Sequence, residues 1–245
     1  MGKLYPELDE RLRKFIHTQS VFFVATAPCL SADGDGGHIN LSPKGYRDTF
    51  AVLGPRQVAY VDLTGSGAET IAHLRQNGKI TIMFCSFGRE SKILRLYGTG
   101  RVVLPGAREW DDLLARFPAA GFGSNEASRR AIIVVDLDRV ADSCGYAVPV
   151  MELAEERDVL ARYDQKKSAA ELAAYRAEKN AVSIDGLPAL TGLAAAELSC
   201  AAPTAAGPTA AGPTAAGPTA TDLNAVDVSA GGPASHGTGT GPAAG

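Results

Sequence analysis

The chain has 245 residues, with 24 lysines and arginines against 27 aspartates and glutamates. The segment from residue 191 onward holds three of the acidic residues and no basic one, so the rest is balanced at 24 of each. This balance argues against a nucleic-acid-binding protein, which typically has an excess of basic residues. No apolar run in the sequence is long enough to span a membrane.

The N-terminal region and the spacing of the cysteines bear on the cellular compartment in which the protein is expected. Residues 1–14 are charged and contain no apolar stretch of signal-peptide length. The four cysteines are scattered without a C-x-x-C pair, which argues against both a disulfide framework and a metal site. We therefore expect a cytoplasmic protein in a reducing environment, with no metal, no nucleic-acid partner and no membrane partner.

The C-terminal segment, residues 191–245, consists almost entirely of Ala, Gly, Pro, Thr and Ser. Within it, residues 202–219 repeat P-T-A-A-G. Such a stretch has too little apolar surface to offset the entropy of ordering it, and collagen would need glycine at every third position. The composition predicts a disordered tail.

In chain order, residues 6–20 have the apolar spacing of a short amphipathic helix. A buried strand is predicted next at residues 20–27, followed by a Gly- and Asp-rich loop at 31–37. Residues 38–44 then alternate, with the polar side chains on one face and the apolar ones on the other.

The middle of the chain continues with strands and short helices. A Gly-Pro-Arg turn at 54–56 predicts a hairpin, and a helix after residue 66 closes at Asn77-Gly78. The remaining predicted elements are hairpin strands at 49–53 and 57–63, strands at 79–87, 92–104 and 131–137, and helices at 107–117 and 150–178. Six or seven short strands with brief connections favour a barrel over a doubly wound parallel sheet.

The sequence between residues 58 and 85 is the most informative for chemistry. Ser66-x-x-Glu69 fits a capping box, and a helix start with free amides also suits a phosphate. Because capping boxes are frequent at helix starts, a helix cap without any ligand is the simpler interpretation.

Three basic residues on predicted strands are further candidates for an anion site, namely Lys44, Lys92 and Arg95. Lys44 lies on a polar face, where a solvated lysine is the alternative. Arg95 lies among apolar residues, where a charge needs a partner, and a structural salt bridge is as good an explanation as an anion. Strand alternation puts Lys92 and Arg95 on opposite faces unless a bulge intervenes.

Catalytic motifs of hydrolases, metalloproteases and P-loop enzymes are absent from the sequence. The four histidines are isolated from one another, and His38 and His73 are better explained as surface or structural residues. The catalytic residues therefore stay unknown.

The order and spacing of several segments resemble the pyridoxamine 5'-phosphate oxidase-like, FMN-binding split-barrel family over about residues 8 to 188. The segments that carry the resemblance are residues 22–26, 37–45, 58–67, 73–84 and 92–103, while 143–149 and 180–188 look like features of one branch. The resemblance implies a mainly β fold, a six-stranded split β-barrel with short flanking helices. It also implies a homodimer with FMN at the subunit interface. We expect the barrel at 1–150, a C-terminal helical extension at 151–190 and the disordered tail at 191–245.

By this resemblance, the residues that would bind the cofactor are Asn40, Ser42, Lys44, Asp62, Leu63, Thr64, Ser66, Glu69, Thr70, Lys92 and Arg95. Many relatives have Lys or Arg where this chain has Thr70. That departure weakens phosphate binding or shifts it to Lys44, Lys92 and the helix amides, and it leaves deazaflavin and haem open as alternative cofactors. A C-terminal Arg and Trp pair specific for pyridoxamine is not evident.

The resemblance implies an FMN-dependent oxidoreductase that acts on a small-molecule substrate, in which the cofactor carries the hydride. Two alternatives stay open: a non-catalytic flavin- or haem-binding sensor and a deazaflavin-dependent reductase. A haem-degrading relative is a more distant alternative, since histidines are few.

Overall fold

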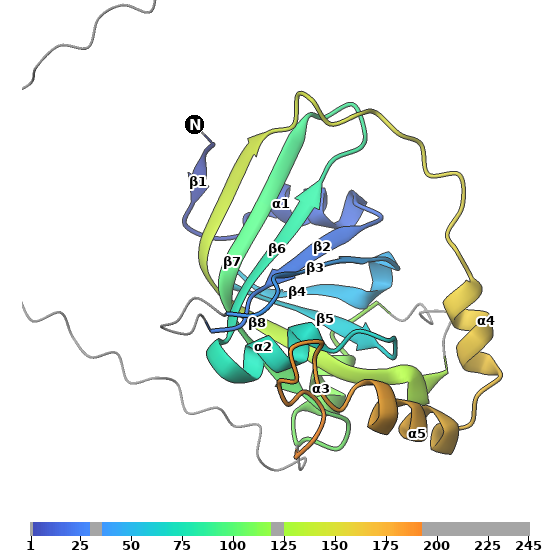
Figure 1. Cartoon of the computed structure of the whole chain (residues 1–245). Helices are drawn as coiled ribbons and strands as arrows, with labels where there is room; N and C mark the ends of the chain where they lie inside the picture. The colour runs from blue at the N-terminus through green and yellow to red at the C-terminus, as the bar shows by residue number, and fades with distance from the viewer. Residues whose placement is uncertain (1, 30–35, 119–124, 193–245) are drawn as a thin grey trace, which may run out of the picture. The chain divides into compact units, whose positions relative to one another are not determined.

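The computed structural model describes residues 2–29, 36–118 and 125–192. The predicted tail from residue 193 onward and most of the predicted loop at 31–37 lie outside the described residues. Within the described part, the chain forms one antiparallel sheet with short helices against it (Figure 1). The prediction of a mainly β protein is therefore confirmed.

The sheet has eight strands, joined in the order β3-β2-β6-β7-β8-β5-β4, with β1 pairing to β8 off this path. The strands are β1 (Leu4–Tyr5), β2 (Phe22–Thr26), β3 (Asn40–Lys44), β4 (Phe50–Gly54), β5 (Gln57–Leu63), β6 (Lys79–Cys85), β7 (Lys92–Val103) and β8 (Arg129–Cys144). The seven strands predicted along the chain are present. The eighth, β1, was missed because two residues carry no alternation pattern.

The longest strand, β8, holds the sheet together. One part of it pairs with β5, from Gln57 opposite Asp136 to Leu63 opposite Arg129, while β7 pairs along nearly its whole length. Figure 1 shows the sheet strongly curved, with β8 bending to serve both halves. The pairing path ends at β3 and β4, and the described residues contain no ladder between these two edges. Closure into a six-stranded split barrel therefore stays a prediction.

Two apolar clusters lie on opposite faces of β5 and β8, as strand alternation requires. The larger cluster includes Tyr60 and Ile133, and the smaller one includes Val61 and Ile132. Because both faces are covered, these strands are continuous apolar runs rather than alternating ones. Four rings pack within the larger cluster, with centroids 5.0–5.7 Å apart: Phe22, Phe50, Tyr60 and Phe84.

Three helices flank the sheet. Helix α1 (Glu10–Thr18) buries one apolar face in the larger cluster, and Asp9 caps it by accepting from the Leu12 amide at 2.8 Å. Helix α2 (Glu69–Asn77) packs against β7 and β2 and ends at Gly78, whose φ of 69° is the left-handed conformation predicted for its C-cap. Helix α3 (Trp110–Leu114) covers the smaller cluster and is shorter than the predicted 107–117. Two 3-10 turns complete the set, η1 (Arg47–Thr49) and η2 (Glu126–Ser128).

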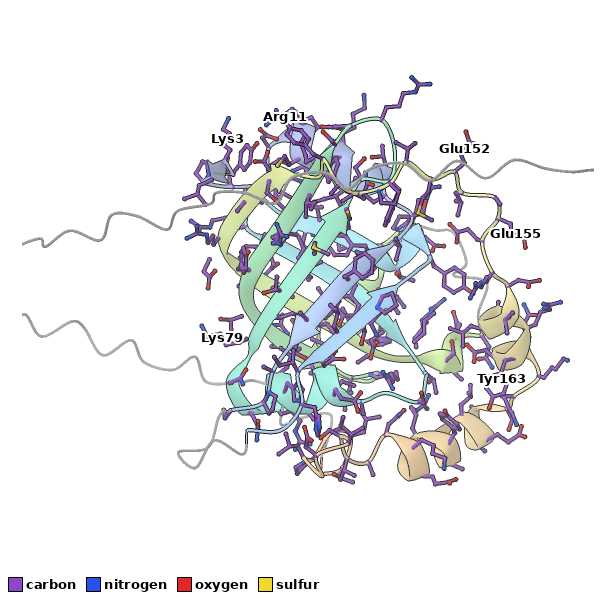
Figure 2. All side chains as sticks on the ribbon, turned by 45° about the horizontal axis from the view of Figure 1, so that its top comes forward. Lys3, Arg11, Lys79, Glu152, Glu155 and Tyr163 are labelled. Carbon is purple, nitrogen blue, oxygen red and sulfur yellow. The ribbon has the colours of Figure 1, made fainter. Side chains whose placement is uncertain are left out.

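The C-terminal part differs from the prediction of one helix over residues 150–178. It forms two helices, α4 (Val159–Gln165) and α5 (Ala169–Lys179), after a non-helical stretch. Figure 2 shows Glu152 and Glu155 on that stretch pointing away from the sheet. Residues 150–158 are exposed throughout, the apolar Val150, Met151 and Leu153 included, so no burial compensates the cost of forming a helix there. No helix among the described residues is long and apolar enough to cross a membrane.

Candidate functional site

Strand β3 places its polar side chains inward and its apolar ones outward. Asn40, Ser42 and Lys44 are half-buried, whereas Leu41 and Pro43 between them are exposed. This is the reverse of an ordinary edge strand, in which the apolar face is the buried one. The alternation predicted from the sequence is confirmed, and its polar face lines the candidate site.

A network of hydrogen bonds links β3 to α2 and β2. The Asn40 amide donates to the Thr26 hydroxyl at 3.1 Å and to the Thr70 hydroxyl at 3.0 Å, and its oxygen accepts from Ser42 at 2.8 Å. On the other side of Thr26, its hydroxyl lies 3.0 Å from His73 Nδ1. His73 is fully enclosed, and burial lowers its pKa, so it is a neutral structural residue.

Asp62 at the end of β5 is buried between two cations. Lys44 Nζ lies 2.9 Å from one of its carboxylate oxygens, and Arg130 Nε lies 2.8 Å from the other. Burial alone would raise the pKa of Asp62, but the charges and hydrogen bonds of Arg130 and Lys44 outweigh it and lower the pKa to about 2. Asp62 is therefore a fixed anion that orients both cations.

A small polar cavity of about 150 Å³ opens beside this triad, at the start of α2. It is lined by Ser42, Lys44, Leu63, Gly65, Gly67, Glu69, Thr70 and Arg130. Five of the predicted cofactor-binding residues thus meet at one place, and Asn40 and Asp62 lie directly behind them. The first-turn amides of α2 have no intrahelical acceptors, so the cavity combines hydroxyl, cationic and main-chain donors.

The predicted capping box at Ser66 and Glu69 is wrong. Helix α2 has Ala68 as its N-cap with no side-chain cap, and Ser66 is exposed. Glu69 instead accepts from the Ile184 amide at 3.4 Å. The structure therefore leaves the start of α2 without a side-chain acceptor of its own.

Thr64 does not line this cavity. Its hydroxyl donates to the Ser128 carbonyl at 2.9 Å and accepts from Arg176 at 3.1 Å. These two contacts join the turn after β5 to η2 and to α5.

Lys92 and Arg95 lie apart from the cavity. Lys92 pairs with Glu90 and lies 5.0 Å from the centre of the Phe15 ring. Arg95 donates to the Ser143 hydroxyl at 2.9 Å on the opposite face of β7. Neither residue lines the cavity within this chain.

Three residues of the site region were not predicted. Arg130 completes the buried triad, Arg176 contacts Thr64, and the Asn180 amide donates to the Gly65 and Ser66 carbonyls at 2.8 and 3.2 Å. Arg130 had a usable signal, because a charge beside the apolar run of β8 must find a partner. Arg176 lies in a charged helix, where no pattern marks it, and Asn180 is the C-cap of that helix and begins the segment 180–188, for which the resemblance implies no role.

The C-terminal segment therefore packs against the turn that carries the site. Besides the contacts of Arg176 and Asn180, Asp185 accepts from His38 Nδ1 at 2.6 Å and from the His38 amide at 2.8 Å. No cluster of three or more His, Cys, Asp or Glu side chains that could hold a metal occurs in the described part of the chain.

Comparisons with known proteins place the chain in a family. The model described as "Pyridoxamine 5'-phosphate oxidase" matches residues 8–144. The pyridoxamine 5'-phosphate oxidase family protein ustO of Aspergillus flavus is 40% identical over 207 residues, covering 78% of each chain.

Solved structures give weaker likenesses. The FAD binding protein from Mycobacterium smegmatis has 11% identity and a TM-score of 0.40, covering 58% of this chain and 96% of its own. Group A Streptococcus HupZ has 22% identity and a TM-score of 0.37, covering 54% and 91%. Because both TM-scores are below 0.5, these structures do not support an assignment. The match to the family model and the similarity to the fungal protein do support one: the chain belongs to the pyridoxamine 5'-phosphate oxidase family.

Proposed function

We propose that the chain is a flavin-binding oxidoreductase that holds the phosphate of FMN in the polar cavity at the start of α2. The observation that carries the proposal is the donor set around this cavity. Ser42 and Thr70 supply hydroxyls, Lys44 and Arg130 supply charge, and the first turn of α2 supplies amides that no side chain caps. Amides at a helix start and guanidinium or ammonium groups are what a phosphate ester requires.

The donor types fit a phosphate, while the balance of charge predicts weak binding. Lys44 and Arg130 are already paired with Asp62, and Glu69 lines the same cavity. A phosphate must share both cations with Asp62 and approach a second carboxylate. Thr70 adds a hydroxyl where many relatives have a basic residue. We therefore expect an affinity for FMN that depends strongly on Lys44 and Arg130.

We further propose that the active form is a homodimer. A cavity of about 150 Å³ holds only the phosphate end of FMN, since sites for molecules of that size are commonly 300 Å³ or more. The ring system must lie outside it. Edge strand β3 presents Leu41, 66% exposed, and the residue before the strand, Ile39, is 78% exposed. A second copy that covers this apolar edge would complete the site.

When bound, the flavin would supply hydride transfer to or from a small-molecule substrate. The residues of this chain bind and orient it. Asp62 is held ionised between two cations, and burial raises the pKa of Tyr60 well above its usual value, so that it stays a neutral phenol. His73, the one buried histidine among the described residues, lines none of the described cavities. We assign no acid or base to the reaction.

The full-length protein, purified without added cofactor, tests the proposal by its visible spectrum, native mass and titration with FMN. We expect a dimer mass and, after titration with FMN, a bound-flavin spectrum that NAD(P)H or dithionite bleaches reversibly. Lys44→Gln should weaken FMN binding at least tenfold, whereas Lys79→Gln, at an exposed lysine on β6, should leave it unchanged.

The other results are equally informative. A deazaflavin spectrum or a Soret band would replace FMN by the corresponding cofactor. Flavin that binds but never turns over with any donor would indicate a sensor. A colourless dimer that takes up no FMN or FAD would end the proposal.

A further inference from the structure

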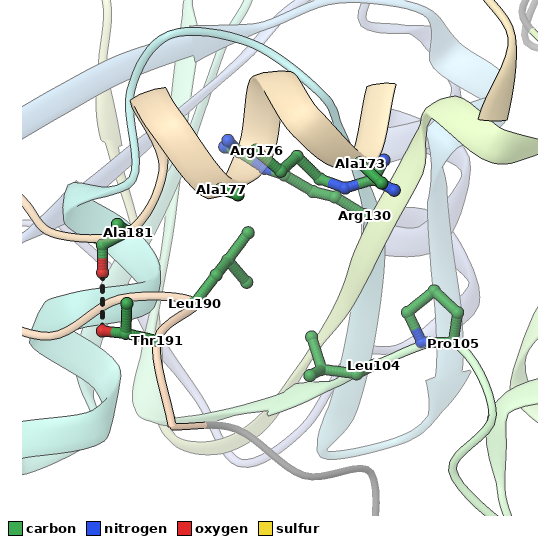
Figure 3. A pocket seen from close by; sticks show the side chains of 9 residues that line it. All are labelled: Leu104, Pro105, Arg130, Ala173, Arg176, Ala177, Ala181, Leu190 and Thr191. Atoms are coloured by element: carbon green, nitrogen blue, oxygen red, sulfur yellow. Dashed lines mark hydrogen bonds between the residues drawn. The ribbon is translucent and has the colours of Figure 1, made fainter. Parts of the chain in front are cut away.

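A second, larger cavity of about 450 Å³ lies behind the site, between α5 and the sheet. It is lined by Leu104, Pro105, Arg130, Ala173, Arg176, Ala177, Ala181, Leu190 and Thr191. It is formed by the two residues after β7, the start of β8, one side of α5 and the loop that follows α5. Figure 3 shows Arg176 and Arg130 at one wall, facing Leu104, Pro105 and Leu190. The side chains that line the cavity are thus apolar except for two guanidinium groups and Thr191, whose hydroxyl is bonded to the Ala181 carbonyl.

The walls are held in place by hydrogen bonds. Thr191 donates through its hydroxyl to the Ala181 carbonyl at 2.9 Å, and Arg75 donates to the Ala189 and Thr191 carbonyls at 2.6 and 2.9 Å. Leu190 is bonded through its amide to the Asn180 carbonyl at 3.0 Å. These contacts form the loop into a fixed wall opposite Arg176.

The cavity is lined by positively charged side chains but by no negatively charged ones. No aspartate or glutamate lines it. Arg130 is paired with Asp62, but Arg176 has no carboxylate within ion-pair distance among the described residues and donates only to Thr64 and to the Ala127 carbonyl, both through one nitrogen. Burial and the nearby charge of Arg130 lower the pKa of Arg176, as expected for a cation without an anion. The remaining donors of its planar fork have no acceptor in the described residues.

We propose that this cavity binds a small organic monocarboxylate, with its carboxylate on Arg176 and its apolar body against Leu104 and Leu190. One unpaired guanidinium matches one negative charge, and the guanidinium fork matches a carboxylate geometrically. The volume lies in the range of ordinary small-molecule sites, which are mostly apolar with a few polar groups. A dianionic phosphate would leave one charge uncompensated among apolar walls, which is costly.

The inference goes beyond the proposed flavin site and does not need it. The two cavities share only Arg130. Arg176 and the apolar wall belong to the larger cavity alone.

Isothermal titration of the full-length protein with benzoate and with its neutral isostere benzamide tests the proposal. We expect benzoate to bind and benzamide to bind at least tenfold more weakly. Arg176→Gln should weaken benzoate binding at least tenfold. The matched control is Arg116→Gln, at an exposed arginine that also donates to one main-chain carbonyl, from Leu53; it should leave both benzoate binding and FMN binding as in wild type.

A second variant keeps the test decisive if Arg176→Gln fails to fold. Ala177→Phe retains both arginines and fills the cavity, and it should abolish benzoate binding while the far-ultraviolet spectrum stays unchanged. Benzoate that binds Ala177→Phe as it binds wild type would overturn the proposal. So would equal binding of benzoate and benzamide, no binding of benzoate to wild type, or tighter binding of phenyl phosphate than of benzoate. A loss of FMN binding with benzoate binding intact would defeat the flavin site alone.

Discussion

The starts of helices α2 and α5 carry the same sequence pattern and are built differently. Ser66-x-x-Glu69 and Ser168-x-x-Glu171 both read as capping boxes. At α5 the box forms: Ser168 accepts from the Glu171 amide, and Glu171 accepts from the Ser168 amide at 2.9 Å. At α2 neither contact is made, and Ala68 is the N-cap.

The difference lies in what surrounds each helix start. The turn before α2 is held from outside, by Arg130 on the Gly65 carbonyl at 3.1 Å and by Asn180 on the Gly65 and Ser66 carbonyls. These contacts set the path of the backbone, so that Ser66 faces solvent. The turn before α5 is exposed, and local hydrogen bonds alone determine it. A helix start fixed by tertiary contacts is free to leave its amides to a ligand, whereas a locally capped one is not.

The largest expected effect is on the buried triad that frames the α2 start. Asp62→Ala removes the carboxylate that pairs with both Lys44 and Arg130. Because the buried Arg130 and the half-buried Lys44 both lose their partner, we expect a loss of about 3–5 kcal/mol in the free energy of unfolding, measured with urea. The control is Asp158→Ala at the N-cap of α4, where its side chain makes no cap and its ion pair with Arg162 is exposed; it should cost less than about 1 kcal/mol. Equal costs for the two would show that the triad does not hold the turn.

Two acidic residues, Asp62 beside the start of α2 and Asp164 in α4, should change the stability of the protein with pH in opposite directions. The pKa of Asp62 falls from 3.8 to about 2 on folding, so its contribution is complete above pH 3.8 and is lost as the pH falls toward 2. We expect the stability difference between wild type and Asp62→Asn to shrink by about 2 kcal/mol over that window.

Asp164 in α4 provides the opposite case. Burial raises its pKa, and the Ser128 hydroxyl opposes that rise only weakly. Its contribution is complete below pH 3.8 and is lost as the pH rises through its folded pKa. Asp164→Asn should therefore gain stability relative to wild type as the pH rises. Urea unfolding at a series of pH values measures both trends, and a common sign would contradict this account.

Asn180 is the contact by which the C-terminal segment holds the α2 start. Asn180→Ala leaves the Gly65 and Ser66 carbonyls without this donor, and we expect a cost of about 1–2 kcal/mol. Hydrogen exchange should become faster at residues 65–69 and stay unchanged in the paired parts of β7 and β8. Gln57→Ala, which removes an exposed side-chain bond to Asp136, is the control and should leave exchange at residues 65–69 as it is.

The features that the sequence predicts well are those with a local pattern, such as the alternation of polar and apolar residues in a strand. Strands β2 to β8 were found from alternation or apolar runs, and Gly78 marked the end of α2. The polar face of β3 and Asp62 were also placed at the site, through the family resemblance. Arg130, Arg176 and Asn180 were missed because their roles come from pairing across more than 45 residues of chain. Lys92 and Arg95 do not line the cavity within one chain, and their contact with a cofactor stays a prediction.

The smallest predicted effect tests the comparison between the two helix starts most directly. Ser168→Ala removes a cap that is made, and should cost about 1 kcal/mol in the free energy of unfolding. Ser66→Ala removes a hydroxyl that is exposed and caps nothing, and should stay within about 0.5 kcal/mol of wild type. The two substitutions are chemically identical, so the difference between their costs in free energy of unfolding shows whether each serine caps its helix. If Ser66→Ala cost as much as Ser168→Ala, the α2 start would be locally capped in solution, and its amides would not be available to a phosphate.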